Sequence, residues 1–259
     1  MVHWTPYYAY MMKREAQILE HISRNTSAPV RRLCTYSTTF DNALGHPFIM
    51  MTRLEGESAC NIWFDDEYDE DDPKTNFRFG GLPLPAVEKK RINFLRSLAQ
   101  VMAEINKIPF QDIGMPIVPV DGSAPPSISP MYQYDFTVDD GCIEQPVFTS
   151  TQDYVRTRPY SLRMSEAIVS NSKIQDYVLG ARTLLDMIFA QPVFNPSPSI
   201  PETFTLHHCD LDLQDILVDN EGSVTGIIDW DKCLSVPHFP VTLCNRITEE
   251  EKLVVMERR

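Results

Sequence analysis

Apolar and charged residues recur with a helical period near the beginning of the chain. Ala16, Leu19 and Ile22 are three residues apart, and charged residues occupy the other faces of the same segment. This period predicts an amphipathic helix over residues 10–24. The segment 25–29 reads Asn-Thr-Ser-Ala-Pro, and this composition predicts that the helix stops there.

Two strand-like segments, residues 30–37 and 47–54, follow this helix, and residues 41–45 between them have turn composition. Within the second segment, residues 48–51 form a continuous apolar run, which predicts a buried strand. Gly56 comes after this strand and predicts a change of direction, because glycine adopts backbone conformations that other residues avoid.

The strongest helical pattern covers residues 86–107. Its predicted inward face consists of Ile92, Leu95, Leu98, Ala99, Met102 and Ile105. Charged residues lie mostly opposite, as in a helix that packs on a core. A second helical pattern covers residues 173–191, and the Pro/Ser-rich stretch 116–130 predicts irregular backbone.

A short β-rich segment, residues 204–230, follows these helices. Phe204 and Leu206 alternate with polar residues and predict a strand that runs into a polar loop. The runs 216–218 and 224–228 flank a turn and predict a hairpin. The order of elements predicts an α+β chain of two lobes, a small mixed part followed by a helix-rich part.

Three carboxylates are expected to converge at this hairpin. Asp215 directly precedes its first strand, Asp229 follows its second strand, and Asp210 lies in the loop upstream. Like charges that lie close together repel one another, so the cluster favours a bound cation. Phosphoryl transfer uses one carboxylate to accept a proton and further oxygen ligands to hold magnesium. We interpret Asp219, by contrast, as ordinary turn chemistry.

The segment from His208-Cys209-Asp210 to Asp215, followed by Gly-Ile-Ile-Asp-Trp at 226–230, resembles the aminoglycoside phosphotransferase and choline kinase-type family, in particular its fungal branch. The family pattern is H-G-D-x-x-x-x-N and then I-D-W. The resemblance implies Asp210 as the catalytic base, Asp215 and Asp229 as ligands of Mg²⁺, and His208 as a structural support of the loop. It implies ATP-dependent phosphoryl transfer to a hydroxyl group of a small molecule.

The resemblance extends upstream and covers roughly residues 8–235. Residues 13–19 are similar to the family's helix whose glutamate, Glu15 here, pairs with a phosphate-binding lysine. Residues 47–56 are similar to the hinge, where backbone groups of Thr52, Arg53 and Leu54 are expected to bind the adenine of ATP. A protein kinase-like fold follows as an expectation, with residues 1–56 as a partial N-terminal lobe and hinge, and residues 57–259 as a mainly helical catalytic lobe.

Three departures from the family pattern leave the activity open. First, Asp215 stands where the family has asparagine. Second, the family's first strands have no counterpart, and Lys13, the lysine near Glu15, does not share a helix face with it. Third, the resemblance stops after about residue 237, so we expect a chain truncated at both ends. The alternatives are an active phosphotransferase, a catalytically impaired pseudokinase-like module that binds nucleotide, and a non-functional truncated fragment.

Composition narrows the choice of partners. The net charge of −13 argues against nucleic acid, and we interpret the acidic run 65–72 as a solvated loop. No apolar stretch approaches the roughly 20 residues of a membrane span, and no signal pattern opens the chain, so a cytoplasmic location without membrane partners is expected. Six cysteines are scattered without C-x-x-C spacing, which favours reduced thiols, although disulfides remain open.

Overall fold

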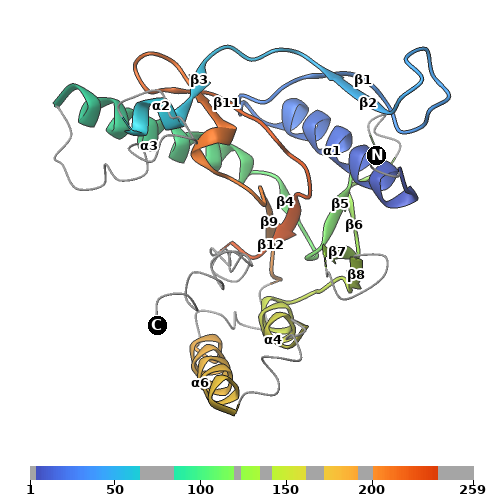
Figure 1. The fold of residues 1–259 in the computed structure, drawn as a ribbon, viewed down its shortest axis with the longest axis vertical. Coiled ribbons are helices and arrows are strands. Elements are labelled where there is room, and N and C mark those ends of the chain that lie inside the picture. The colour runs from blue at the N-terminus through green and yellow to red at the C-terminus, as the bar shows by residue number, and fades with distance from the viewer. Residues whose placement is uncertain are drawn as a thin grey trace. The chain divides into compact units, whose positions relative to one another are not determined.

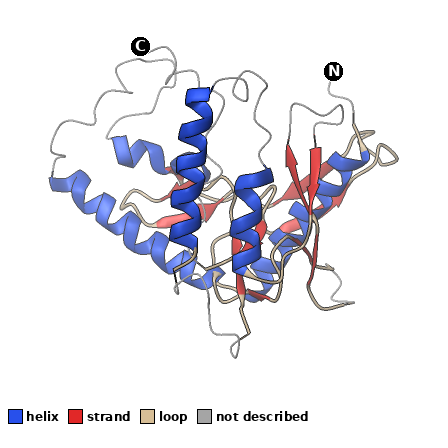
Figure 2. Cartoon of the chain, turned by 90° about the horizontal axis from the view of Figure 1, so that it is seen from below, coloured by secondary structure: helices blue, strands red, loops and turns tan. Residues whose placement is uncertain are grey.

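A computed structural model describes residues 4–64, 85–119, 124–134, 142–161, 172–191 and 201–238 (Figure 1). Helices and small sheets mix throughout this part, so the predicted α+β class is confirmed (Figure 2). The acidic run 65–72 lies outside the described residues. None of the helices in the described ranges has the length and apolar character to cross a bilayer.

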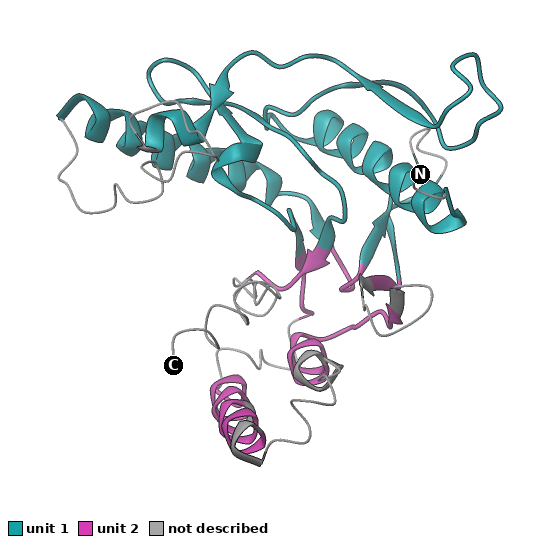
Figure 3. Ribbon diagram, in the orientation of Figure 1, with its two compact units in different colours: residues 1–109, 115–129, 205–234 teal, residues 110–114, 130–204, 235–259 magenta. Residues whose placement is uncertain are grey.

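The chain forms two compact units (Figure 3). Unit 1 comprises residues 1–109, 115–129 and 205–234, and unit 2 comprises residues 110–114, 130–204 and 235–259. The lobe boundary expected at residue 56 stays a prediction.

The elements fall in the following order along the chain. The helices are α1 (Pro6–Asn25), α2 (Ala59–Phe64), α3 (Pro85–Ile105), α4 (Thr151–Ser161) and α6 (Ser172–Phe189). The strands are β1 (Leu33–Ser37), β2 (Phe48–Met51), β3 (Glu57–Ser58), β4 (Pro109–Phe110), β5 (Met115–Ile117), β6 (Ser127–Ser129), β7 (Met131–Tyr134), β8 (Cys142–Gln145), β9 (Phe204–His207), β10 (Ile216–Val218), β11 (Val224–Ile227) and β12 (Leu234–Val236). The 3-10 turn η3 (Leu213–Asp215) precedes β10.

Helix α1 confirms the predicted N-terminal helix and begins four residues earlier than expected. The Thr5 hydroxyl accepts a hydrogen bond from the Tyr8 N–H at 3.4 Å, and Pro6 occupies the first turn, where its missing N–H costs nothing. The buried face of α1 consists of Ala16, Gln17, Ile18, Leu19 and Ile22. The helix contacts β1 and β5.

Strands β1 and β2 form an antiparallel pair, which confirms two strands joined by a turn. The expectation that 48–51 is a buried strand is wrong, because Met50 is 51% exposed. In the described part of the chain, the pair is a sheet of only two strands, which leaves Met50 exposed.

Strands β10 and β11 form the predicted hairpin, and β3 pairs with β10 on its other side. The turn has the expected chemistry, since Asp219 Oδ1 accepts hydrogen bonds from the N–H groups of Glu221 and Ser223, both at 2.9 Å. Gly222 completes the turn with a φ of +86°. This hairpin positions the carboxylates that the sequence singles out.

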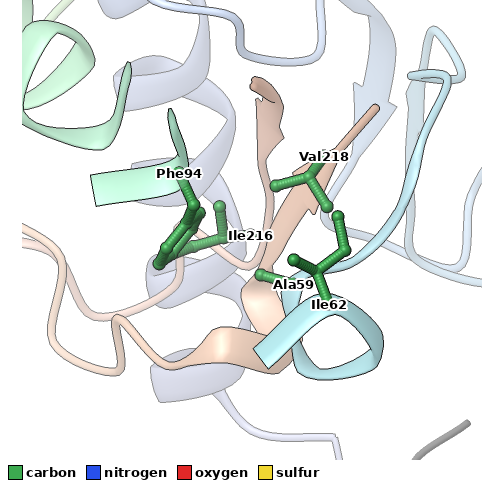
Figure 4. Close-up of a cluster of buried hydrophobic side chains, with 5 residues drawn as sticks. All are labelled: Ala59, Ile62, Phe94, Ile216 and Val218. Carbon is green, nitrogen blue, oxygen red and sulfur yellow. The ribbon is translucent and has the colours of Figure 1, made fainter. Parts of the chain in front are cut away.

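The hairpin rests on a cluster of buried side chains (Figure 4). Ala59 and Ile62 of α2, Phe94 of α3, and Ile216 and Val218 of β10 form this cluster. The predicted inward face of α3 is therefore partly wrong: its buried residues are Val87, Phe94, Val101 and Ile105. Ile92 and Leu95 of the predicted face are 42% and 52% exposed. Apolar residues cover a wide sector of this helix, and its packing against α2 and β11 selects the side that carries Phe94.

Other sheets are smaller. Strands β5 and β6 pair in antiparallel fashion, so the stretch 116–130 is not wholly irregular as predicted. Strands β7 and β8 form a hairpin in unit 2, and β4, β9 and β12 form a three-stranded sheet. Helix α6 confirms the helix predicted over 173–191, although several of its large apolar residues are exposed: Tyr177, Leu179, Leu184, Met187 and Ile188.

We expect Gly56→Ala to lower the free energy of unfolding by about 3 kcal/mol, because strain and overlap act together. Gly56 has a φ of +128°, and a Cβ there would overlap Thr225 Oγ1 and approach Val218 O to 2.8 Å. Urea denaturation measures the change. Gly45→Ala is the matched control, because Gly45 has a φ of +66° and nothing within 4 Å, so only about 1 kcal/mol should be lost. Equal losses would contradict the close approach of residue 56 to the hairpin.

Candidate active site

The loop after β9 carries the H-C-D sequence, and its histidine is held from two sides. His208 is 2% exposed, and its Nε2 donates a hydrogen bond to the carbonyl oxygen of Ile228 at 2.8 Å. Its ring meets the Trp230 ring edge to face, with centroids 4.8 Å apart. The Trp230 indole in turn donates to Ile227 O at 3.0 Å. These contacts fix the loop to the end of β11, as expected for a structural histidine.

Asp215 is a buried carboxylate at the end of η3. The turn begins at Asp212, whose side chain accepts a hydrogen bond from the Leu213 N–H at 2.5 Å. The Ile228 N–H donates to the backbone oxygen of Asp215 at 2.9 Å, which ties η3 to the residue before Asp229. Asp215 is 8% exposed, and its Oδ2 is buried without a hydrogen-bond partner among the described residues. A buried oxygen of this kind is costly when the carboxylate is charged.

The electrostatics of Asp215 show which groups lie around it. Burial raises the pKa of its carboxyl, and the charge of Asp229 raises it further. The nearby His208 acts in the opposite direction, while Asp210 and Asp212 add smaller increases to this pKa. The charges of Asp229 and Asp210 therefore both act on the Asp215 carboxyl, and the convergence of the three side chains on one metal site stays a prediction. Among the described residues, however, no three His, Cys, Asp or Glu side chains are arranged to hold a metal ion.

The backbone after β11 is strained at two positions. Asp229 has a φ of +61° and Lys232 a φ of +53°, in the left-handed region that non-glycine residues avoid. Aspartate tolerates this region better than most residues, and such strain concentrates at functional sites. Lys232 Nζ lies 3.1 Å from Asp231 Oδ2, so this turn also brings a cation to the acidic cluster.

Glu15 of α1 lies near this turn. Burial, followed by the charges of Asp231 and Asp229, raises the pKa of Glu15 to about 7, and Arg31 opposes this increase. Arg31 follows Val30, which forms a parallel bridge with Ile227 of β11. The Arg31 Nε is buried and makes no hydrogen bond to any residue that the structure describes. The charge of Arg31 therefore stabilises the ionised form of Glu15. The sequence pattern did not predict this role for Arg31.

The expected hinge residues Thr52, Arg53 and Leu54 stay a prediction as an adenine site. The Thr52 N–H donates to Arg32 O at 3.0 Å, and the Thr52 hydroxyl accepts from the Arg32 N–H at 2.9 Å. The N–H of Thr52 therefore already donates a hydrogen bond to the residue just before β1. Thr52 and Arg53 are exposed, and the Leu54 side chain lies over Gly226.

We expect Glu15→Gln to raise stability more at pH 8 than at pH 5. The folded chain holds the Glu15 proton more tightly than the unfolded chain, so this contribution to stability is present below about pH 4.5 and is lost as the pH rises through about 7. After allowance for solvent screening, the gain at pH 8 should be about 1–2 kcal/mol. Urea denaturation in a chelating buffer at both pH values measures it.

Glu20→Gln is the matched control for this experiment. Glu20 lies on the same helix and pairs with Arg24 at 2.6 Å. Its substitution should cost up to about 0.5 kcal/mol at either pH. A Glu15→Gln effect that is the same at pH 5 and pH 8 would contradict the raised pKa.

We compared the chain with models of protein families and with curated proteins, and neither comparison gives a match. Among solved structures, it matches the apo form of a thermostable mutant of aminoglycoside phosphotransferase APH(4)-Ia. The match covers 88% of this chain and 57% of that chain, with a TM-score of 0.41 and 13% sequence identity. This chain therefore spans little more than half the length of the protein it matches.

Proposed function

We propose that the chain is a kinase-like phosphotransferase, similar to aminoglycoside phosphotransferases, that transfers a phosphoryl group from ATP to a hydroxyl group of a small molecule. The environment of the Asp215 carboxylate carries this proposal. Its Oδ2 is buried without a hydrogen-bond partner in the described part of the chain, and the charges of Asp229 and Asp210 act on the same carboxylate. A bound cation would stabilise these carboxylates, because their like charges repel one another.

A divalent cation fits this arrangement. Hard cations such as Mg²⁺ prefer carboxylate oxygens and often take only one or two from the protein, so a preformed three-residue cage is not required. Asp215 Oδ2 and the exposed carboxylate of Asp229 would hold it. When bound, Mg²⁺ would neutralise charge on the nucleotide phosphates. Asp215 and Asp229 are connected by the hydrogen bond between Ile228 N–H and Asp215 O, which fixes their spacing.

Asp210 is the proposed base. It is exposed in the loop that follows β9, so a hydroxyl group from solvent can reach its carboxylate. The loop is held by the His208 hydrogen bond to Ile228 O at 2.8 Å, which keeps Asp210 at the same end of the hairpin as Asp229. Asp210 would orient the acceptor hydroxyl and take its proton as the phosphoryl group transfers.

Glu15 and the hinge complete the proposed nucleotide site. Glu15, with Arg31 beside it, faces the same turn as Asp229 and would help to place the phosphates. The backbone of Arg53 and Leu54 would contact adenine, with Thr52 contributing less because its N–H donates to Arg32 O.

The second candidate is a module that binds nucleotide with negligible turnover. The absence of a preformed group of three metal ligands in the described part of the chain favours it. The extra negative charge of Asp215, where the family has asparagine, points in the same direction.

The test is a thermal midpoint measured with and without Mg·ATP, followed by an assay of ATP consumption with a panel of hydroxyl compounds. The phosphotransferase predicts an upward midpoint shift that requires both Mg²⁺ and ATP, together with turnover that depends on the acceptor. A shift without turnover supports the binding module. No shift at all would overturn both proposals and leave a fragment without this function.

A further inference from the structure

Two cysteines lie beside one another at the candidate active site. Cys209 directly precedes Asp210, and Cys233 lies just beyond the strained turn that begins at Asp229. The Cys209 thiol donates a hydrogen bond to the carbonyl oxygen of Lys232, with Sγ and O 2.8 Å apart. That oxygen and the Cα of Cys233 belong to one planar peptide group. The Cys209 sulfur therefore contacts the peptide group that carries Cys233.

A second relation runs in the opposite direction. The backbone of Cys209 acts on the thiol of Cys233 and opposes the increase of its pKa. Each cysteine thus interacts with the backbone at the other, and the charge of Cys209 acts on the thiol of Cys233. Cys34 and Cys60, on β1 and α2, have no such relation to one another, and these four described cysteines form no disulfide.

The two thiols differ in access. Cys209 is half-buried, whereas Cys233 is 4% exposed. Burial, together with the charges of Cys209 and Asp231, raises the pKa of Cys233 well above its usual range. Cys209 is therefore the sulfur that an oxidant meets first, and Cys233 is the protected partner behind it. A protonated partner reacts slowly, so closure over minutes is expected.

We propose that Cys209 and Cys233 form a reversible disulfide that restrains the loop carrying Asp210 and thereby controls the site. The disulfide itself follows from the contacts of the two cysteines, and only its effect on ATP consumption rests on the proposed function.

The oxidant is a peroxide, and the reaction balances in two steps. The Cys209 sulfur attacks hydrogen peroxide, the O–O bond breaks, and Cys209 becomes a sulfenic acid with release of one water. The Cys233 sulfur then attacks Sγ of Cys209, the S–O bond breaks, and the S–S bond forms with release of a second water. Together the two thiols lose two electrons and two protons to the peroxide. A dithiol reductant returns both electrons and restores the thiols.

A disulfide would change the loop because its geometry is fixed. The Cys209 sulfur must leave the Lys232 oxygen, since the S–S bond requires a separation of about 2.05 Å between the sulfurs and a dihedral angle near ±90°. Asp210 is the next residue along the chain, so its backbone turns with that movement. The carboxylate of Asp210 would then lie differently with respect to Asp215 and Asp229.

The first experiment measures the bond. The full chain is reduced, freed of reductant, treated with hydrogen peroxide, alkylated, and digested for mass spectrometry. We expect a cross-linked pair of peptides containing Cys209 and Cys233, and deuterium uptake in residues 207–213 that is slower by roughly tenfold. Cys34→Ser should give the same cross-link, because Cys34 is exposed on β1. Cys209→Ser and Cys233→Ala should give no cross-link and no change in uptake.

The second experiment measures ATP consumption. Peroxide should lower it roughly tenfold in the wild type and in Cys34→Ser, with recovery in dithiothreitol, while Cys209→Ser and Cys233→Ala resist. Oxidised Cys209 without a cross-link, or a cross-link that leaves deuterium uptake unchanged, would overturn the proposal. If the reduced chain consumes no ATP, the proposed function fails, and the cross-link and the uptake still decide the disulfide.

Discussion

Asp210→Asn is expected to lower acceptor-dependent ATP turnover by roughly 10²–10⁴-fold, the usual contribution of a general base. Asparagine has nearly the same shape as aspartate but cannot accept the proton of the acceptor hydroxyl. Asp210 is exposed, so its replacement leaves the core intact. Steady-state assays give kcat, and the midpoint shift in Mg·ATP should remain close to that of the wild type, because Asp215 and Asp229 are unchanged.

Asp219→Asn is the matched control for this substitution. Asp219 lies in the turn of the hairpin that follows the Asp210 loop, but its Oδ1 accepts hydrogen bonds from Glu221 and Ser223, and the amide oxygen of asparagine can accept both. Turnover should therefore stay within about twofold of the wild type, since the general-base contribution is not touched. Unchanged turnover in Asp210→Asn would remove Asp210 from the proposed mechanism, whereas equal losses in both variants would indicate a fault in the hairpin.

Phe94→Ala is expected to lower the free energy of unfolding by about 3–5 kcal/mol, the cost of removing a large aromatic side chain from a core. Phe94 is 3% exposed and packs with Ile62 and Ile216 (Figure 4). The cavity would lie directly under β10, so the spacing of Asp215 and Asp229 should loosen as well. Urea denaturation measures the stability, and the Mg·ATP midpoint shift reports on the site.

The neighbouring residue supplies the control. Leu95 is 52% exposed, so Leu95→Ala should change stability by no more than about 0.5 kcal/mol. Comparing the stability losses of the two variants also shows which face of α3 is buried, because the helical pattern of the sequence placed Leu95 inward and did not select Phe94. A larger loss for Leu95→Ala would favour the pattern over the structure.

Local features of the chain were the ones that sequence could predict. The β10–β11 hairpin follows from two β-rich runs around a polar turn, and Asp219 forms the turn hydrogen bonds expected of it. Helix α1 follows from its period. In each case the neighbours that determine the conformation lie within a few residues of one another.

Features that depend on distant partners were missed or mistaken. Met50 is exposed because β1 and β2 form a sheet by themselves, which their apolar composition does not reveal. The pairing of β5 with β6 spans a Pro-rich stretch that reads as irregular. On α3, the apolar sector is wider than the buried one, so period alone could not choose between Phe94 and Leu95.

In the candidate site, too, relations within one hairpin could be predicted from the sequence, and relations between distant segments could not. Asp215 and Asp229 were predicted to be near each other because one hairpin connects them. Arg31 and Asp231 could not be assigned to Glu15, because that relation depends on how α1 and the segment after it meet the hairpin. Cys209 is part of the H-C-D motif, but its relation to Cys233 depends on the turn after Asp229.

The parallel bridge between Val30 and Ile227 has a consequence for how the protein folds. Ile227 N–H donates to Pro29 O at 3.0 Å, so two segments about 200 residues apart in sequence meet as neighbours. Closing so long a loop costs conformational entropy before any contact compensates for it, and such topologies fold slowly. During synthesis, Val30 cannot form this bridge until β11 has left the ribosome. We therefore expect the nascent chain to depend on chaperones over that interval, while the exposed apolar side chain of Met50 in β2 remains a site for aggregation.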